Sequence, residues 1–159
     1  MNQAENTIIV RNAVEADLPI CVQLSADFHA ASPMRRVSLF EPEGYKEFLR
    51  GAIDNPDICI LLAELNGEVV GITAGIIYPL YFSPSHKVSQ ELLWWLTPAA
   101  RGSGVGNKMF NQLQLWSKER GAKTIFMIAL EDERSAKMEK VYCRAGFEPM
   151  ERTFMKGIE

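Results

Sequence analysis

The sequence predicts a mixed α/β domain, and three observations lead to this prediction. Apolar residues recur at helical spacing in several segments, and runs rich in β-branched residues lie between them. Two of these runs flank Asn66-Gly67, a pair of residues that is the strongest short-range signal for an antiparallel hairpin. A glycine-rich stretch then separates a buried strand from a helix, which predicts a parallel crossover. With 159 residues, 47% of them hydrophobic, the chain fits a single domain over residues 1–159.

The first part of the chain predicts one strand and two helices. Thr7–Ala13 is rich in β-branched residues and is expected to form the opening strand. A helix follows from Glu15, in which Pro19 is tolerated only because it falls in the first turn. The stretch from Ser32 is irregular, and a second helix is expected to begin at Pro42, whose fixed φ suits the first helical position.

The middle of the chain predicts three strands. Ile58–Leu65 and Glu68–Tyr78 flank Asn66-Gly67, and both turn residues accept the positive φ of a type I′ turn. Ser89–Thr97 is apolar on both faces and is expected inside the sheet. The intervening "PLYFSPSHK" (Pro79–Lys87) is interpreted as an aromatic loop that carries prolines.

The last third predicts a helix, a strand, a helix and a strand. The helix over residues 104–120 carries one apolar stripe, and Gly121 stands where its C′ residue belongs. Lys123–Leu130 is expected to be a buried strand, and Glu133–Ala145 a helix that ends at a glycine. Phe147–Lys156 is expected to form the last strand.

Composition excludes several classes of function. The net charge of −3 offers none of the basic surplus that is typical of nucleic-acid binders. No run approaches the roughly 18 apolar residues of a membrane span, so no membrane partner is expected. The start lacks the pattern of a secretory signal, which favours a cytoplasmic protein. His29 and His86 have no second ligand at metal-binding spacing, so no metal is expected.

Residues 101–106 read "RGSGVG" and predict an anion site, with a plain tight turn as the alternative. Free N–H groups at a helix N-terminus favour an anion, and the missing Cβ atoms let phosphate oxygens approach the backbone. A P-loop is excluded, because Asn107 and Met109 break its pattern. A dinucleotide fingerprint fits Gly102 and Gly104 but fails at Asn107, which leaves nicotinamide binding as a weaker alternative.

"RGSGVG" followed by a helix resembles the R/Q-x-x-G-x-G/A signature of the GNAT superfamily, the acetyl-CoA-dependent N-acetyltransferases. "IIVRNAVEADLP" is similar to that family's opening strand and first helix. "ELLWWLTPAARGSGVGNKMFNQLQLW" resembles its fourth strand, loop and third helix, and "SAKMEKVYCRAGFEPM" its closing helix and Gly-Phe turn. The resemblance implies a mixed, mostly antiparallel sheet of six to seven strands, splayed between the fourth and fifth and flanked by about four helices.

The resemblance also implies where acetyl-CoA binds. Its pyrophosphate is expected on the backbone amides of Arg101, Gly102, Ser103, Gly104, Val105 and Gly106. The pantetheine arm is expected beside Trp95, Leu96 and Thr97, with a main-chain N–H near Trp95 polarising the thioester carbonyl. Ser135 stands where the family often has an Asn that touches this arm, so this contact is expected in altered form.

Two side chains are candidates for catalysis. Glu91 is the only ionisable residue in "ELLWWLTP", and a carboxylate in an apolar strand is costly without a partner or a role. It matches the family's base position, although Glu91 solvated at the strand mouth, with water as the base, is an alternative. Tyr142 matches the family's tyrosine in the last helix, and its pKa of about 10 lies above that of a thiol, so it is the candidate acid. The alternative for Tyr142 is an ordinary half-buried helix residue.

The predicted function is an acyltransferase that moves an acetyl group from acetyl-CoA to a primary amine by direct attack in a ternary complex. A CoA-binding module without turnover is the main alternative, and a nicotinamide-dependent oxidoreductase is a weaker one. The family's acceptor site corresponds to roughly Phe28–Tyr45 and Tyr78–Lys87, which match no known motif. Small-molecule and protein amines therefore both stay open as acceptors, as does a homodimer, which is common in the family.

Overall fold

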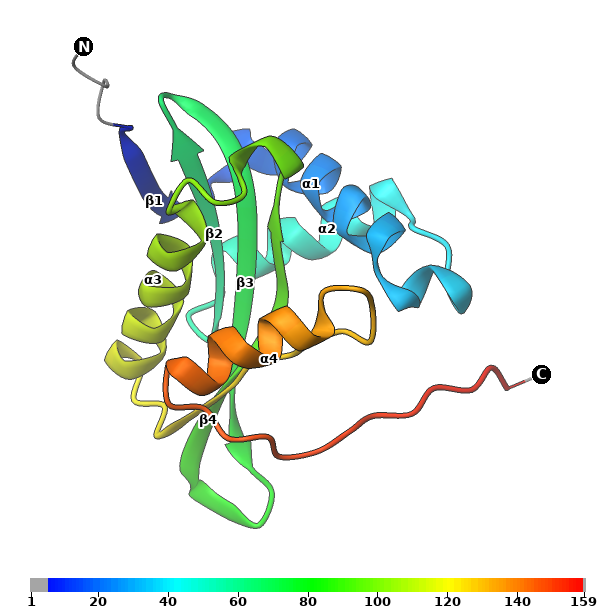
Figure 1. The fold of residues 1–159 in the computed structure, drawn as a ribbon, viewed down its shortest axis with the longest axis vertical. Helices are drawn as coiled ribbons and strands as arrows, with labels where there is room; N and C mark the ends of the chain where they lie inside the picture. The colour runs from blue at the N-terminus through cyan, green and yellow to red at the C-terminus, as the bar shows by residue number, and fades with distance from the viewer. Residues whose placement is uncertain (1–5, 159) are drawn as a thin grey trace.

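Five strands form one sheet in the order β1-β2-β3-β4-β5, and four α-helices surround it within residues 6–158, the part of the chain that this computed structural model describes (Figure 1). The strands are β1 (Ile8–Asn12), β2 (Ile58–Leu65), β3 (Glu68–Leu80), β4 (Ser83–Leu96) and β5 (Thr124–Phe126). The helices are α1 (Leu18–Ala31), α2 (Pro42–Ile53), α3 (Val105–Glu119) and α4 (Ser135–Arg144). Neighbouring strands are antiparallel except for β4 and β5, which are parallel. The mixed α/β class is confirmed, with fewer strands than the six to seven expected.

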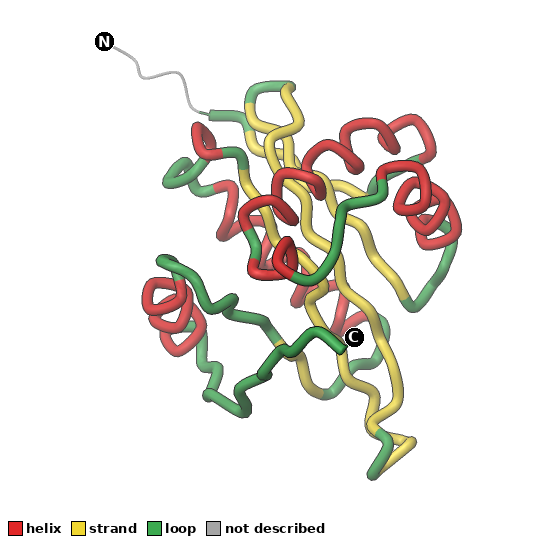
Figure 2. The backbone as a smooth tube through the Cα atoms, turned by 90° about the vertical axis from the view of Figure 1, so that its right-hand side faces the viewer, coloured by secondary structure: helices red, strands yellow, loops and turns green. Residues whose placement is uncertain are grey.

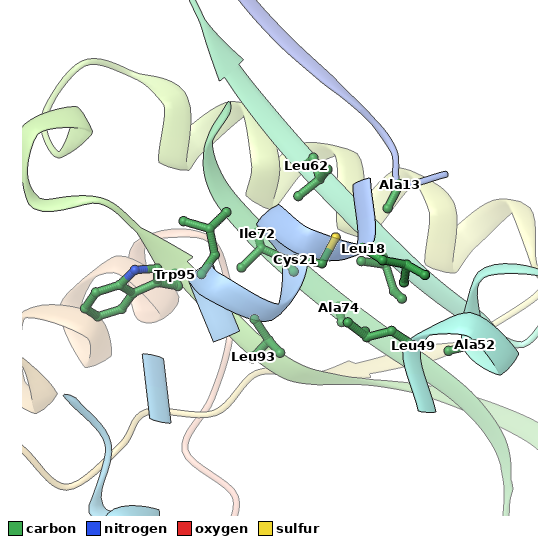
Figure 3. Packing of buried hydrophobic residues seen from close by; sticks show 12 residues of the cluster. Ala13, Leu18, Cys21, Leu49, Ala52, Leu62, Ile72, Ala74, Leu93 and Trp95 are labelled. Carbon is green, nitrogen blue, oxygen red and sulfur yellow. The ribbon is translucent and has the colours of Figure 1, made fainter. Parts of the chain in front are cut away.

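The helices divide between the two faces of the sheet. The apolar sides of α1 and α2 pack on one face, where they bury Leu18, Cys21 and Leu49 against Leu62 and Ile72 (Figure 3). The apolar stripe of α3 packs on the other face (Figure 1). Its members are Val105, Met109, Leu113 and Trp116. Side chains of alternate residues in β4 therefore enter two separate cores.

The local signals for turns and helix ends are confirmed. Pro19 is the second residue of α1, and Pro42 is the first residue of α2. Asn66 and Gly67 have φ of 54° and 88°, as the type I′ turn between β2 and β3 requires. Gly121, directly after the C-cap of α3, has φ of 82°.

The predicted aromatic loop over Pro79–Lys87 is wrong. β3 and β4 continue through it as a hairpin arm that extends beyond the rest of the sheet, with Tyr81 and Phe82 at its tip (Figure 1 and Figure 2). Pro79 and Pro84 lie beyond the residues at which β2 and β5 pair with this arm. The outer edges of the arm therefore tolerate residues without an N–H group.

The predicted last strand, Phe147–Lys156, is also wrong. This segment runs extended below α4 and pairs with no strand that the structure describes (Figure 1). The strand expected over Lys123–Leu130 shortens to β5, which has three residues. Such a short strand offers little edge for a further strand to join.

The sheet splays at the middle of β4, as expected. β4 pairs with β5 only over Val88–Gln90, whereas its pairing with β3 continues to Leu96. The register with β3 also shifts by one residue at this point, because Gly75 is opposite Glu91 and Ala74 is opposite Leu93. Leu92 is therefore the extra residue of a β-bulge, and the alternation of side chains shifts by one after it.

Candidate active site

The glycine loop, residues 101–106, joins β4 to α3. Gly102 and Gly104 have φ of 82° and 91°, a region that other residues rarely adopt. Gly106 lies in the first turn of α3 and has no positive φ, and a Cβ there would lie 3.4 Å from Leu96 Cδ1, in ordinary contact. Among the described residues, no backbone acceptor takes the amides of Gly102, Gly104, Val105 and Gly106. Free donors at the start of a 15-residue helix suit an anion.

The second half of β4, Glu91–Leu96, has an open edge where β5 has diverged. The Thr97 N–H donates to Val70 O at 2.9 Å, which shows that residue 97 points its backbone groups toward β3. By the alternation of an antiparallel ladder, Trp95 does the same, and Trp94 and Leu96 point theirs to the open edge. Of the three residues expected beside pantetheine, only Leu96 thus presents its N–H and C=O there, and Trp94 joins it.

Glu91 lies at the branching point of β4 and β5, one residue before the bulge. It is 4% exposed, and its Oε2 accepts a hydrogen bond from the N–H of Ile128 at 3.0 Å. Burial raises the pKa of Glu91 to about 7, against the opposing effect of the Ile128 hydrogen bond. The carboxyl is therefore not solvated at a strand mouth, and it changes protonation near neutral pH.

Tyr142 projects from α4 toward Ile128, the residue that Glu91 also contacts. It is 7% exposed, and its hydroxyl donates to the carbonyl of Ile128 at 3.0 Å. The rings of Trp94, Phe110 and Phe147 pack around it at centroid distances of 6.4, 6.3 and 5.9 Å. Burial, and then the nearby charge of Glu91, raise the pKa of Tyr142 above its usual value. The phenol therefore keeps its proton and acts as a donor.

Glu91, Ile128 and Tyr142 form a unit that we call the Ile128 clasp. Ile128 follows β5 and lies beyond the last residue pair between β4 and β5. No described strand pairs with the peptide groups of Ile128, and two side chains bind them instead: Glu91 accepts from its N–H and Tyr142 donates to its C=O. The clasp holds a carboxyl and a phenol side by side at the open edge of β4.

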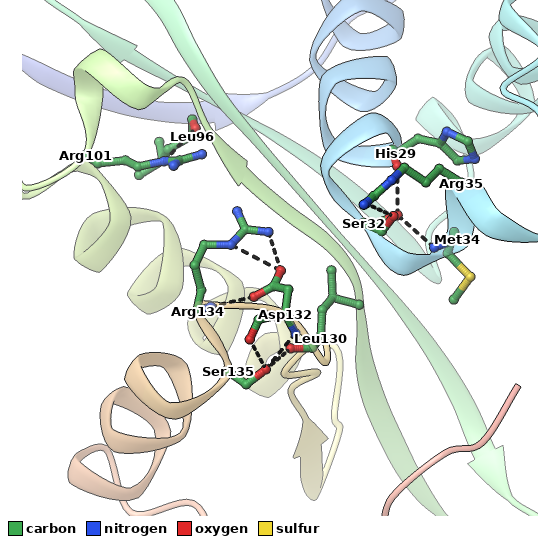
Figure 4. A network of polar contacts seen from close by, with 10 residues as sticks. All are labelled: His29, Ser32, Met34, Arg35, Leu96, Arg101, Leu130, Asp132, Arg134 and Ser135. Atoms are coloured by element: carbon green, nitrogen blue, oxygen red, sulfur yellow. Dashed lines mark hydrogen bonds and ion pairs between the residues drawn. The ribbon is translucent and has the colours of Figure 1, made fainter.

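The hydroxyl of Ser135 is engaged within the loop before α4. It hydrogen-bonds the carbonyl of Leu130 and accepts from the N–H of Asp132 at 2.8 Å (Figure 4). Asp132 in turn accepts from Arg134, through both its main-chain N–H and its guanidinium. Ser135 therefore shapes this loop, and its contact with pantetheine stays a prediction.

Trp95 lies on the opposite face of β4 from Trp94. Its ring meets Phe28 of α1 edge-on, with centroids 6.4 Å apart. The guanidinium carbons of Arg101 and Arg134 lie 4.8 and 5.7 Å from its ring centroid. The indole Nε1 is buried and has no hydrogen-bond partner among the described residues.

Other features of the described chain add no further site. Residues 6–158 contain no group of three His, Cys, Asp or Glu side chains that could hold a metal ion. A cavity of about 450 Å³ lies near the β2–β3 turn, lined in part by Leu65, Val70 and Thr97, and it includes neither Glu91 nor Tyr142. None of the helices described is long and apolar enough to cross a bilayer.

Comparison with known protein families identifies the family of this chain. The family described as the Acetyltransferase (GNAT) family matches residues 23–147, most of the chain. The chain belongs to the GNAT family. It is therefore an acyltransferase, and the oxidoreductase alternative is dropped.

One relative of this GNAT protein resembles it in sequence, and solved structures resemble it in fold. YhfO of Bacillus subtilis (strain 168), an uncharacterized N-acetyltransferase, is 29% identical over 109 residues, which are 67% of this chain and 69% of that protein. An aminoglycoside N-acetyltransferase solved with CoA has a TM-score of 0.77 at 15% identity, and covers 98% of this chain and 97% of its own. An aminoglycoside acetyltransferase from an uncultured soil metagenomic sample, solved with trehalose, has a TM-score of 0.73 at 19% identity, with 96% and 97% covered.

Sequence reasoning missed three parts of this GNAT site. Ile128 contributes only its peptide groups, which any residue carries, so no sequence signal marks it. The bulge at Leu92 appears only in the register between β3 and β4. Arg134 lies next to Ser135 but belongs to no pattern, and only the fold brings it to Trp95.

Proposed function

We propose that this GNAT protein transfers an acetyl group from acetyl-CoA to a primary amine by direct attack in a ternary complex. One observation carries the proposal: the Ile128 clasp brings Glu91 and Tyr142 together where the sheet opens. A base with a pKa near 7 and a protonated phenol are the two groups that this reaction needs.

The coenzyme is proposed to bind along two sets of free backbone groups. The glycine loop offers the amides of Gly102, Gly104, Val105 and Gly106 to the pyrophosphate, with Arg101 and Ser103 completing the turn. The open edge of β4 offers the N–H and C=O groups of Trp94 and the N–H of Leu96 to the pantetheine arm, whereas the Leu96 carbonyl accepts from Arg101 Nε. An aminoglycoside N-acetyltransferase with a TM-score of 0.77 to this chain was solved with CoA, which supports the assignment.

The proposed reaction breaks a C–S bond and forms a C–N bond. The amine nitrogen attacks the thioester carbonyl, whose oxygen accepts from a main-chain N–H of the open edge. Ionised Glu91 takes the proton that the nitrogen loses, directly or through water. The departing thiolate accepts a hydrogen bond from Tyr142. The thiolate then gains one proton from water, and protonated Glu91 returns the proton of the amine to water, so the thiol and the carboxylate are both restored.

The raised pKa of Tyr142 refines its proposed role. A phenol with a pKa well above that of a thiol, about 8.5, favours keeping its proton over transferring it completely. Tyr142 therefore stabilises the thiolate mainly as a hydrogen-bond donor. In this role the Tyr142 hydroxyl either gives up its hydrogen bond to the Ile128 carbonyl and donates to the sulfur, or donates one bifurcated hydrogen bond to both acceptors.

A thiol-release assay over a panel of amines tests the proposal, together with thermal unfolding in the presence of acetyl-CoA, CoA or NADH. We expect stabilisation by the first two ligands and release of CoA with at least one amine. Stabilisation by acetyl-CoA without thiol release for any amine would instead identify a CoA-binding module without turnover.

A further inference from the structure

Two guanidinium groups and an unpartnered N–H group meet at the end of β4. Arg101 comes from the glycine loop and Arg134 from the loop before α4, and both lie over the ring of Trp95, at 4.8 and 5.7 Å. Figure 4 shows the two side chains reaching toward the same end of β4. Segments more than 30 residues apart thus place two cations on one indole.

The indole N–H of Trp95 lacks an acceptor. Trp95 is 8% exposed, and its Nε1 has no partner in the part of the chain that the structure describes. Buried donors without a partner are rare and destabilising, which favours an acceptor that arrives with a ligand. Indole can only donate, so that ligand must supply an oxygen or another acceptor atom.

The charges around Trp95 favour an anionic acceptor. Arg134 pairs with Asp132, at 2.5 Å, whereas Arg101 donates only to the main-chain carbonyl of Leu96. Only one of the two guanidinium groups, that of Arg134, therefore has a carboxylate partner among the described residues. A carboxylate on a ligand would match the planar donors of an arginine and would also satisfy the indole N–H.

The position of Trp95 assigns this anion to the acceptor and not to the coenzyme. Trp95 faces the side of the sheet covered by α1, where Phe28 meets its ring. The free amides of the glycine loop begin α3, on the opposite face, where Trp94 packs with Phe110 and Tyr142. We propose that the acceptor is an amine that also carries a carboxylate, bound by Arg134, Arg101 and the Trp95 N–H. This inference rests on the proposed acetyl transfer.

A binding experiment tests the subsite without turnover. The three tryptophans give three indole N–H signals in an ¹H–¹⁵N spectrum, and the Trp95→Phe variant identifies the Trp95 signal. We expect alanine to shift this signal and ethylamine, which lacks only the carboxylate, to leave it in place. Arg134→Gln should abolish the shift. Arg144→Gln, at the exposed opposite end of α4, is the matched control and should retain it.

A kinetic experiment tests the same subsite with two matched pairs, alanine against ethylamine and lysine against 1,5-diaminopentane. In the native protein we expect kcat/KM to be at least about tenfold higher for the carboxylate-bearing member of a pair. Arg134→Gln should remove most of this preference and leave KM for acetyl-CoA unchanged. Lysine presents two amines at different distances from its carboxylate, so the pairs also vary this spacing.

Three outcomes would overturn the inference. A Trp95 signal that neither alanine nor lysine shifts would exclude the subsite. Faster acetylation of ethylamine and diaminopentane than of the amino acids would exclude the carboxylate preference, while leaving acetyl transfer itself intact. A higher KM for acetyl-CoA in Arg134→Gln, with acceptor preference unchanged, would assign these cations to the coenzyme phosphates.

Discussion

The glycine loop and the Ile128 clasp lie at the two ends of the open edge of β4, and they are built in different ways. The loop works through backbone amides, and its shape depends on the positive φ of Gly102 and Gly104. The clasp works through two side chains, Glu91 of β4 and Tyr142 of α4, which both hydrogen-bond the backbone of Ile128. One is a local feature of the chain and the other is a product of the tertiary fold.

This difference separates binding from chemistry. The loop contributes N–H groups that carry no titratable proton, so it is suited to hold a phosphate at any pH near neutrality. The clasp contributes a buried carboxyl whose pKa is raised to about 7 and a buried phenol. Variants in the loop should therefore change affinity for acetyl-CoA, and variants in the clasp should change turnover and its pH dependence.

The largest expected effect is the loss of acetyl-CoA binding in Gly104→Val. Gly104 has φ of 91° and is the N-cap of α3, so a β-branched residue would reshape the loop and displace its free amides. Losing several hydrogen bonds to a charged group should lower affinity at least about a hundredfold, as measured by isothermal titration calorimetry.

Gly121→Val is the matched control for this variant. Gly121 has φ of 82° at the other end of α3, so both variants should lose roughly 1–3 kcal/mol of stability through the same backbone strain. Only Gly104→Val should also lose coenzyme binding. Equal affinities in the two variants would contradict the assignment of the glycine loop.

The next effect is a fall in turnover in Glu91→Gln. Glutamine keeps an oxygen for the Ile128 N–H but cannot take a proton, so kcat should fall by roughly 10²–10⁴-fold while acetyl-CoA still binds. In the native protein, kcat should rise with pH and level off above a pKa of about 7, because only the ionised carboxyl acts as a base. If kcat of the native protein does not rise with pH in this way, or if Glu91→Gln shows the same pH dependence of kcat, water is favoured as the base.

The same residue should make the fold less stable as pH rises. The pKa of Glu91 is about 7 in the folded chain, against 4.5 for a glutamate exposed to water, so ionisation is disfavoured by folding. Its stabilising protonated state is fully present below pH 4.5 and is lost as pH rises through 7, at a cost of about 3 kcal/mol.

Chemical denaturation of the native protein and Glu91→Gln at pH 5 and pH 8 measures this effect. Glutamine does not ionise, so the variant should gain stability relative to the native protein between the two pH values. If the difference in free energy of unfolding stays constant from pH 5 to pH 8, Glu91 does not have the raised pKa on which its role as base depends.

The contrast between loop and clasp also explains what the sequence could predict. The type I′ turn at Asn66, the start of α2 at Pro42 and the place of the glycine loop between β4 and α3 depend on residues that are adjacent in the chain, and all three were predicted correctly. The anion site on the loop stays a prediction. Glu91 and Tyr142 were identified as candidates, but their shared partner Ile128 was not, because peptide groups leave no signature in side chains. The hairpin arm was missed because proline, as at Pro79, indicates the end of a strand unless the strand has a free edge, which only the fold reveals.

The smallest effect is expected for Tyr142→Phe, compared with Tyr78→Phe. Both hydroxyls make one hydrogen bond: Tyr142 to Ile128 O at 3.0 Å, on the open edge, and Tyr78 to Gln90 Oε1 at 2.7 Å, where β4 is still paired on both sides. Each variant should lose about 1 kcal/mol of stability in denaturant titrations.

Only Tyr142→Phe should also lower kcat, by about tenfold to a hundredfold, because a hydrogen bond to a charged thiolate contributes about 1.5–3 kcal/mol. KM for acetyl-CoA should change little in either variant, since the glycine loop is intact in both. If Tyr78→Phe lowers kcat as much as Tyr142→Phe does, the effect reports loosening of β4, and the phenol of the clasp has no direct part in the reaction. If only Tyr142→Phe is slow, the open half of β4 is the half that carries the chemistry.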